Sequence, residues 1–260
     1  MAFDRSPLLN ALSRWRFWLA LGLFDVRMRY RRSVLGPWWV TIATLTSALA
    51  VGALYSRLFG QPVREFVPYV AAGFVGWSLI AASIGEAPTA LVARAASVSG
   101  RKAVSVPLLF ADMVRRCVVF AHGALAALAV TVFVGAGVGA ATLLFVPNTL
   151  LAVAVLTSLS VPLAYLGARF RDVPELVGVA LVLLFLVTPV LWRPEQVPDA
   201  EWIVALNPFA AVLELLRAPL ITEIAPVRAY FSCLVQLLIG LVLSSTAVRS
   251  GEGRVALWVQ

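Results

Sequence analysis

The sequence is poor in charged residues: 13% of its 260 residues are Asp, Glu, Lys or Arg, whereas 61% are hydrophobic. Soluble globular domains carry about 25% charged and about 45–50% apolar residues. So little polar surface cannot cover a chain of this length in water, and the excess apolar side chains are expected to face lipid. The composition therefore predicts an integral membrane protein and excludes an ordinary soluble domain.

The sequence also has few residues that bind metals or form disulfides. Its two cysteines, Cys117 and Cys233, fall in apolar runs without the spacing of a metal site or a disulfide framework, so we expect them to be packing residues. The single histidine, His122, has no second ligand near it in the sequence. Such a residue either lines a polar path through the membrane or donates a hydrogen bond across a helix interface, and both interpretations stay open.

Signatures of nucleotide binding and catalysis are missing as well. No phosphate-binding loop of the G-x-x-x-x-G-K-[ST] kind occurs, and the closely spaced glycines of residues 135–139 lie between two apolar runs rather than after a strand. Ionisable side chains are nearly absent from the apolar runs, although ion-coupled carriers use such groups near mid-membrane. These absences predict no catalytic residue and no bound cofactor. They also argue against an ion-coupled carrier or a lipid-modifying enzyme.

Basic residues are the exception to this shortage of charge, and they give the chain a formal net charge of +8. Twenty of the 21 are Arg, and most of them flank apolar runs instead of forming one stripe. Nucleic-acid binding and membrane topology both produce basic patches. Because this distribution fits topology, we expect membrane lipid as a partner and no nucleic acid.

The first basic segment, residues 7–33, is predicted to form an amphipathic helix at the membrane surface. Its uncharged stretch, residues 17–24, is far shorter than the roughly 20 residues that a crossing needs. A disordered basic tail is the alternative. Arg16, Arg27 and Arg31 project to one side of the apolar face. By helical spacing, that face consists of Leu8, Leu12, Trp15, Leu19, Leu23, Val26 and Tyr30.

The whole chain, residues 1–260, is interpreted as a single all-α transmembrane domain with six crossings. The first crossing follows a break at Gly36-Pro37 and opens with Trp38 and Trp39, aromatic residues of the kind found at membrane interfaces. The fifth crossing is short for a full span. The predicted spans cover residues 37–59, 66–88, 117–135, 142–168, 176–191 and 227–248.

The basic residues set the orientation that we expect. With six crossings and both termini in the cytoplasm, sixteen basic residues fall on the cytoplasmic side, including the five from Arg94 to Arg116. Five fall on the other side: Arg57, Arg64, Arg193, Arg217 and Arg228. Because cytoplasmic loops carry an excess of Lys and Arg, this bias predicts cytoplasmic termini in the inner (plasma) membrane.

Residues 192–226 interrupt the apolar pattern with five prolines and mixed charges. Two pieces, PDAEWIVAL and PFAAVLELLRAPL, are predicted to form short amphipathic helices. The segment either re-enters the membrane and lines an exit, or is an ordinary surface loop. Aromatic residues also cluster toward the outer ends of the predicted spans, where they either belong to the interfacial belt or face the lumen of a channel. They are Tyr55, Phe59, Phe66, Tyr69, Trp192, Trp202, Phe209 and Tyr230.

Residues 86–106 form the largest expected cytoplasmic segment after the first one. A short helix presented there could dock a soluble partner, or the segment could be a plain basic loop that anchors the topology. Its charged residues include Glu86, Arg94, Arg101 and Lys102.

Four stretches carry a resemblance to a known family. They read RMRYRRSVLGPWW at the first span, SVPLLFADMVRRCVVFAHG entering the third, ARFRDVPEL before the fifth, and TPVLWRPEQVP followed by ALNPF after it. Each stretch is weakly specific alone, whereas the ordered set covers most of the chain. Together they resemble the membrane subunit of ABC transporters that export O-antigen, capsule, teichoic acid or related glycans. RRCVVFAHG is particularly similar to the O-antigen branch.

The resemblance implies a homodimeric six-span channel powered by two separate ATP-binding subunits, which would bind the ATP. The substrate would be a lipid-linked glycan moved from the cytoplasm across the inner membrane; export of a drug, lipid or peptide is the alternative. Residues implied to couple to the ATP-binding subunits are Glu86, Arg94, Arg101, Lys102, Arg16, Arg27 and Arg31. Residues implied to line the channel or its outer gate are Tyr55, Phe59, Tyr69, His122, Trp192, Trp202 and Phe209.

Overall fold

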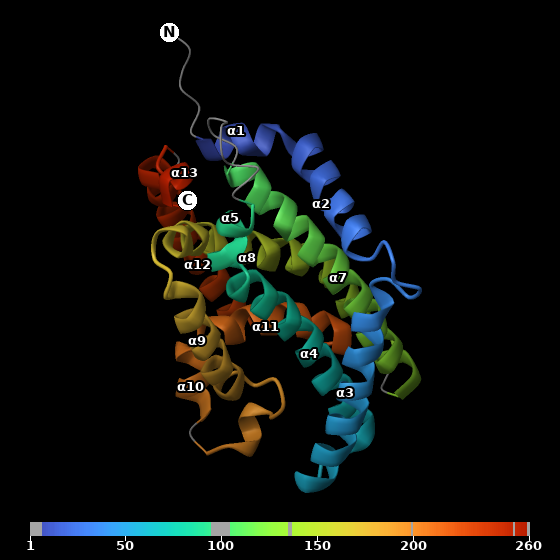
Figure 1. Ribbon diagram of the computed structural model, residues 1–260. Coiled ribbons are helices and arrows are strands. Elements are labelled where there is room, and N and C mark those ends of the chain that lie inside the picture. The colour runs from blue at the N-terminus through green and yellow to red at the C-terminus, as the bar shows by residue number, and fades with distance from the viewer. Residues whose placement is uncertain (1–6, 95–104, 135–136, 199, 252, 259–260) are drawn as a thin grey trace.

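The computed structural model describes residues 7–94, 105–134, 137–198, 200–251 and 253–258. Over these residues the chain forms helices and connecting loops without a β-strand, which confirms the all-α prediction for this part of the chain. Figure 1 shows four helices gathered at one end of the bundle, which we call the arm end: α1 (Pro7–Ser13), α2 (Trp15–Arg29), α5 (Ala87–Ala93) and α13 (Val255–Trp258). The last turns of α3 (Trp38–Leu58) and the short helix α10 (Ala200–Leu206) lie at the opposite end.

The arm consists of two helices, α1 (Pro7–Ser13) and α2 (Trp15–Arg29), instead of the single helix predicted over residues 7–33. Arg14 interrupts them, because its ψ of 32° departs from helical geometry. After α2, residues 30–37 form turns in which Gly36 adopts a φ of 55°, a left-handed conformation that favours glycine. The break predicted at Gly36-Pro37 is therefore confirmed, and α3 begins at Trp38.

Within the described part of the chain, five helical segments are long and apolar enough to cross a membrane. They are α3 (Trp38–Leu58), α4 (Val63–Gly85), α7 (Ser105–Val134), η1 (Ala140–Leu144) continuing into α8 (Phe145–Arg169), and α12 (Val227–Gly251). They correspond to the first, second, third, fourth and sixth predicted spans. The helix at the fifth position, α9 (Val173–Val187), has 15 residues, fewer than the roughly 20 that span a bilayer. Helix length thus supports five crossings, and the sixth stays a prediction.

The third span is longer than predicted, because α7 begins at Ser105 instead of Cys117 and runs for 30 residues. The sequence analysis counted Arg115 and Arg116 with the cytoplasmic segment before this span and did not expect them inside a helix. Both residues lie inside α7, one turn after Asp112. A helix tolerates such charges in a membrane protein when opposite charges pair with them. Those partners come from distant parts of the chain.

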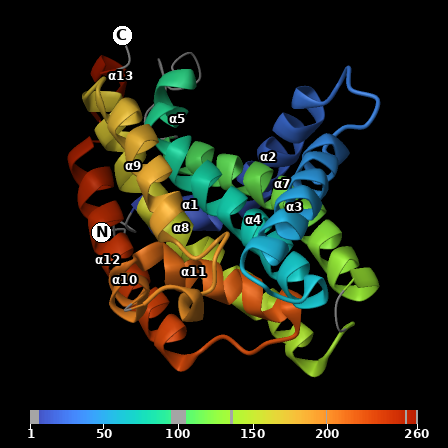
Figure 2. The same ribbon diagram turned by 90° about the horizontal axis from the view of Figure 1, so that it is seen from below.

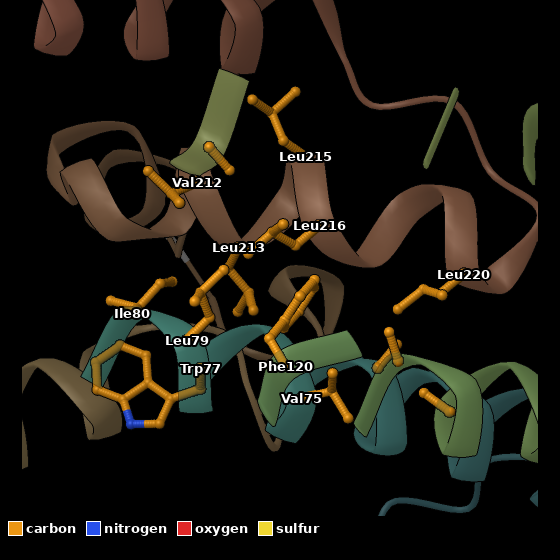
Figure 3. Packing of buried hydrophobic residues seen from close by; sticks show 14 of the residues in the cluster. Val75, Trp77, Leu79, Ile80, Phe120, Val212, Leu213, Leu215, Leu216 and Leu220 are labelled. Carbon is orange, nitrogen blue, oxygen red and sulfur yellow. The ribbon is translucent and has the colours of Figure 1, made fainter. Parts of the chain in front are cut away.

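α4 is the centre of the bundle. Fifteen of its 23 residues are buried, against four of 21 in α3 and none in α9. Figure 3 shows Leu79 and Ile80 of α4 facing α11 (Pro208–Arg217), with Phe120 of α7 beside them. A Cβ on Gly76 would lie 2.7 Å from Leu213 Cδ1, so α4 and α11 approach each other closely because this position is glycine.

The segment after α9 contains both short helices that the sequence predicts, α10 (Ala200–Leu206) and α11. It also contains two 3-10 turns, η2 (Pro194–Gln196) and η3 (Ala218–Ile221). α11 starts with a cap, since the Asn207 side chain accepts the Phe209 backbone N–H at 3.0 Å. Seven of its ten residues are buried, so the surface-loop interpretation is wrong for α11. Figure 2 views the bundle from this end, with α3 and α9 on separate sides of α4.

We expect Leu213→Ala to destabilise the fold by about 2–4 kcal/mol, because it removes a fully buried side chain from the α4–α11 contact. Leu206→Ala is the matched control, since Leu206 of α10 is 76% exposed. Thermal unfolding in detergent, followed by size-exclusion chromatography, measures both. Equal unfolding temperatures for the two variants would contradict the position of α11 in the core.

Candidate functional site

The corner between α4 and α5 (Ala87–Ala93) joins these helices to α7 through a carboxylate. Glu86 caps the end of α4 and the start of α5. Its Oε2 accepts a hydrogen bond from Arg115 Nη2 and another from Arg116 Nε, the latter at 3.3 Å. Because both arginines belong to α7, this carboxylate fixes the corner on that helix.

Arg94, which caps the other end of α5, forms the second half of the site. Its Nη2 donates to Asp25 Oδ2 of α2 and, at 2.7 Å, to Asp112 Oδ1 of α7. Arg115 Nε lies 4.0 Å from the same Asp112 oxygen, which joins the two halves. We call this set the charge network: Asp25, Glu86, Arg94, Asp112, Arg115 and Arg116.

The charge network is electrically balanced, with three carboxylates and three guanidinium groups. Its members differ in exposure: the Arg116 and Asp112 side chains are 3% and 9% exposed, whereas the Glu86 side chain is 41% exposed. Burying charges of this kind is costly unless each has a partner, so the removal of one member leaves another unpaired. The network therefore holds α2, α5 and α7 in one arrangement.

The pKa values at the two ends of α5 reflect this pairing. Burial by itself raises the pKa of Glu86, but the hydrogen bonds and charges of Arg115 and Arg116 outweigh it and hold that pKa below its usual value. Burial lowers the pKa of Arg94, and hydrogen bonds to Asp112 and Asp25 more than compensate, so that its pKa is raised. Both groups are accordingly charged at neutral pH.

α5 is also fixed to α8. A Cβ on Gly167 would lie 2.1 Å from Pro88 O, so the first turn of α5 lies directly against the α8 backbone. Leu91 of α5 is fully buried in an apolar cluster with Val161 and Tyr165 of α8. A force applied to α5 would therefore act on α7 through the charge network and on α8 through this packing.

The structure brings together some of the predicted coupling residues but not all. Glu86 and Arg94 meet in the charge network. Arg16, Arg27 and Arg31 are exposed on or just after α2, and among the described residues none of them has an ion-pair partner, although the Arg16 guanidinium lies 5.4 Å from the centre of the Trp15 ring. Arg101 and Lys102 lie outside the described residues.

Four members of the charge network were missed by the sequence analysis: Asp25, Asp112, Arg115 and Arg116. Two signals were available. Asp25 is the only acidic residue between residues 7 and 33, and Asp112 and Arg115 have the i, i+3 spacing of an ion pair within a helix. Neither signal indicates that Arg94 would contact both carboxylates.

At the opposite end, Tyr69 of α4 holds the loop that follows α9. Its hydroxyl donates to Pro189 O at 3.2 Å or to Trp192 O at 3.1 Å. The Arg217 guanidinium lies 3.9 Å from the centre of the Tyr69 ring and also donates to Pro189 O at 2.6 Å. Glu214 pairs with Arg217. Tyr69 thus connects three elements: α4, α11 and the loop that follows α9.

Three of the predicted channel residues form a row of aromatic rings that leads to this point. The ring centres of Tyr55 and Phe59 lie 5.5 Å apart at the end of α3, and the ring centre of Phe59 lies 6.2 Å from that of Phe66 in α4. Phe66 stacks on Tyr69 at 6.1 Å. Contacts of this length are typical of packed aromatic pairs. Tyr55, Phe59 and Tyr69 are therefore neighbours, linked by Phe66.

The remaining predicted channel residues do not join this row. His122 packs edge-on against Trp38 at 5.3 Å, and its Nδ1 lies 2.7 Å from Val118 O of its own helix. This arrangement favours a contact at a helix interface over a polar path. Trp202 is 61% exposed on α10, whereas Phe209 is buried in the first turn of α11. Trp192 contributes its backbone carbonyl to Tyr69.

A polar cavity of about 310 Å³ lies beside Tyr69 at this end. It is lined by both signs of charge, including Arg193, Arg217, Glu214 and Glu223. Burial, followed by the charge of Glu214, raises the pKa of Glu223. Among the described residues, no group of His, Cys, Asp or Glu could hold a metal ion. The two groups of polar contacts hold helices together at the two ends of the bundle.

Sequence comparison with known proteins shows which family the chain belongs to. Two O-antigen export system permease proteins, both named RfbA and both from Klebsiella pneumoniae, are 20% identical to the chain over 191 and 192 residues. Each match covers 73% of this chain and 74% of the relative. A family model for ABC-2 type transporters matches residues 17–221, a range that contains the charge network, α4 and α11. The chain belongs to the ABC-2 type transporter membrane family, whose members are permease components that work with an ATP-binding cassette partner.

Proposed function

We propose that this permease exports a lipid-linked polysaccharide, such as O-antigen, capsule or a related glycan, from the cytoplasm across the inner membrane. The similarity to two O-antigen export permeases over nearly three quarters of both chains carries this proposal. The aromatic row from Tyr55 to Tyr69 fits it, because aromatic faces offer sugar rings weak contacts that let a polymer slide. ATP hydrolysis takes place in the partner, and two copies of that partner serve the complex.

The charge network fits a role in coupling to the partner. With the termini in the cytoplasm, α5 and the arm face the ATP-binding subunits. A push on α5 moves Glu86 and Arg94, and the network passes the displacement to α7 and α2. Arg101 and Lys102, together with the exposed Arg31, supply positive charge for docking the partner. The step is mechanical, and it needs no catalytic group in the permease.

A second copy of the chain is part of the proposal, and α9 supports it. After Glu175 in its first turn this helix is apolar on every side, yet none of its residues is buried in one chain, and Leu176, Val182 and Leu186 are each more than half exposed. It is also too short to span the bilayer alone. A copy packed against α9 and α3, the two least buried apolar helices beside α4, would cover both and enclose a central path between the subunits.

Reconstituted transport tests the proposed substrate. The permease, copurified with an ATP-binding subunit from the same genome, is placed in liposomes containing an undecaprenyl-linked oligosaccharide. We expect this glycolipid to stimulate ATP hydrolysis and to cross the membrane in an ATP-dependent way. Stimulation by a drug or peptide but not by the glycolipid would favour the alternative of a different exported substrate.

Separating α2 from α5 should uncouple the permease from its partner. We expect Asp25→Asn to lower transport at least fivefold while the ATP-binding subunit still copurifies, because Arg94 loses its link to the arm but keeps Asp112. A double-mutant cycle with Arg94→Gln should give an interaction energy of about 1–2 kcal/mol in unfolding measurements.

The matched control for this cycle is Glu65→Gln with Arg193→Gln. That pair lies 4.0 Å apart at the opposite end, and the Glu65 side chain is 63% exposed, so we expect almost no interaction energy. If Asp25→Asn transports normally, the link between the arm and α5 has no part in coupling.

Crosslinking tests the second copy. In a chain with Cys117 and Cys233 replaced by alanine, we expect Val182→Cys on α9 to form a disulfide-linked dimer in membranes. Leu238→Cys on α12 is the matched control, because both side chains are 65% exposed and Leu238 is expected to face lipid. Gel electrophoresis without reductant measures the dimer. Crosslinking at residue 238 but not at 182 would place the interface on α12 and contradict the proposed arrangement.

A further inference from the structure

An apolar cavity of about 600 Å³ lies between part of the arm and three of the long helices. Leu19 and Leu23 of α2 form one wall, and α7, α8 and α12 form the others through residues such as Ala121, Ala154 and Leu241. None of the described residues that line it is charged. Its volume is within the range of about 300–1,000 Å³ found for sites that hold small molecules.

The few polar groups in the cavity wall are already satisfied. The hydroxyls of Thr157, Ser158 and Ser244 donate to backbone carbonyls of Val153, Val155 and Ser158, at 2.6, 2.7 and 2.7 Å. The wall therefore offers no free hydroxyl proton to a ligand. A hydrocarbon chain can fill such a space without leaving a buried polar group unpaired, whereas a sugar would lose hydrogen bonds there.

The cavity is part of the way α2 packs. At Gly22 the arm touches α7 so closely that a Cβ would lie 2.6 Å from Ala111 O and from Val114 Cβ. Asp25 is held by Arg94 one turn further on. With α2 fixed at both points, its leucines cannot move inward to close the space beside them.

The charge around the cavity indicates what kind of hydrocarbon enters it. Arg16 and Arg27 flank Leu19 and Leu23 at spacings of three, four and four residues, so all four side chains share one face of α2. Both arginines are exposed, and among the described residues neither has an ion-pair partner. An unpaired guanidinium is suited to phosphate, which it binds through two parallel hydrogen bonds.

We propose that the cavity holds an acyl chain of an anionic phospholipid from the surrounding membrane, with its phosphate bound by Arg16 or Arg27. The lipid then fills the space between the arm and the bundle, so that the arm rests partly on lipid instead of on protein alone. This inference does not depend on the exported substrate. It assigns Arg16 and Arg27 to the membrane, whereas the resemblance assigns them to the ATP-binding partner.

Native mass spectrometry of the complex with its ATP-binding partner tests this proposal, with phosphatidylglycerol and phosphatidylethanolamine as probes. We expect wild type to retain phosphatidylglycerol in preference to phosphatidylethanolamine. Arg16→Gln with Arg27→Gln should weaken phosphatidylglycerol binding about 10- to 30-fold, because each of the two arginines contributes a similar share of the binding free energy for an anionic headgroup. Arg171→Gln with Arg254→Gln is the matched control, since both residues are exposed at the arm end outside the cavity, and it should bind like wild type.

Filling the cavity with larger side chains is the second part of the test. Ala121→Phe with Ala154→Phe places two rings inside it from opposite walls and should remove the retained lipid, whereas Val146→Phe on the exposed face of α8 should not. Lipid binding unchanged in both the arginine and the phenylalanine variants would overturn the proposal. So would retention of undecaprenyl phosphate in place of phosphatidylglycerol. Loss of the ATP-binding partner from the arginine variant, with its lipid retained, would return both arginines to the partner interface.

Discussion

The balance of charge at the arm end is the constraint on which this half of the molecule depends. Three guanidinium groups and three carboxylates meet there, all but Glu86 mostly shielded from water, and their pairing offsets the cost of burying them. The partners come from α2, α7 and both ends of α5, so none of these elements can move independently without leaving a charge unpaired. α5 becomes a rigid corner between spans, although it is only seven residues long. Its attachment suits it to transmit force.

The other half of the molecule is held together differently. α4 and α11 pack leucine and valine side chains against a glycine at close range, and only a few polar contacts, centred on Tyr69, hold the loop after α9. Arg217 takes part in three of these contacts, because it pairs with Glu214, lies over the ring and donates to Pro189 O. In the proposed function the arm end transmits movement and the opposite end opens, and the two kinds of packing suit those tasks.

Charge in this chain has two roles that composition alone does not separate. Most arginines are exposed, and the sequence analysis assigns them to the membrane boundary. Arg115 and Arg116 lie inside α7, and the sequence does not reveal this because a basic pair before an apolar run looks the same whether it precedes a helix or lies within it. The decisive difference is a carboxylate 29 or 30 residues away in the chain, and no local pattern reveals it. The same holds for the contact between Asp25 and Arg94, 69 residues apart.

The sequence by itself determined the class of the protein, five of its long helices, the break at Gly36-Pro37 and the two short helices after α9. These features follow from hydrophobic runs, from prolines and from a glycine with positive φ, all of which act over a few residues. Only the tertiary structure decided that α11 is buried, that Glu86 and Arg94 belong to one network, and that the arm leaves an apolar cavity beside α7. Those features depend on helices meeting across long stretches of chain, where the geometry of packing decides which charges pair and which spaces stay open.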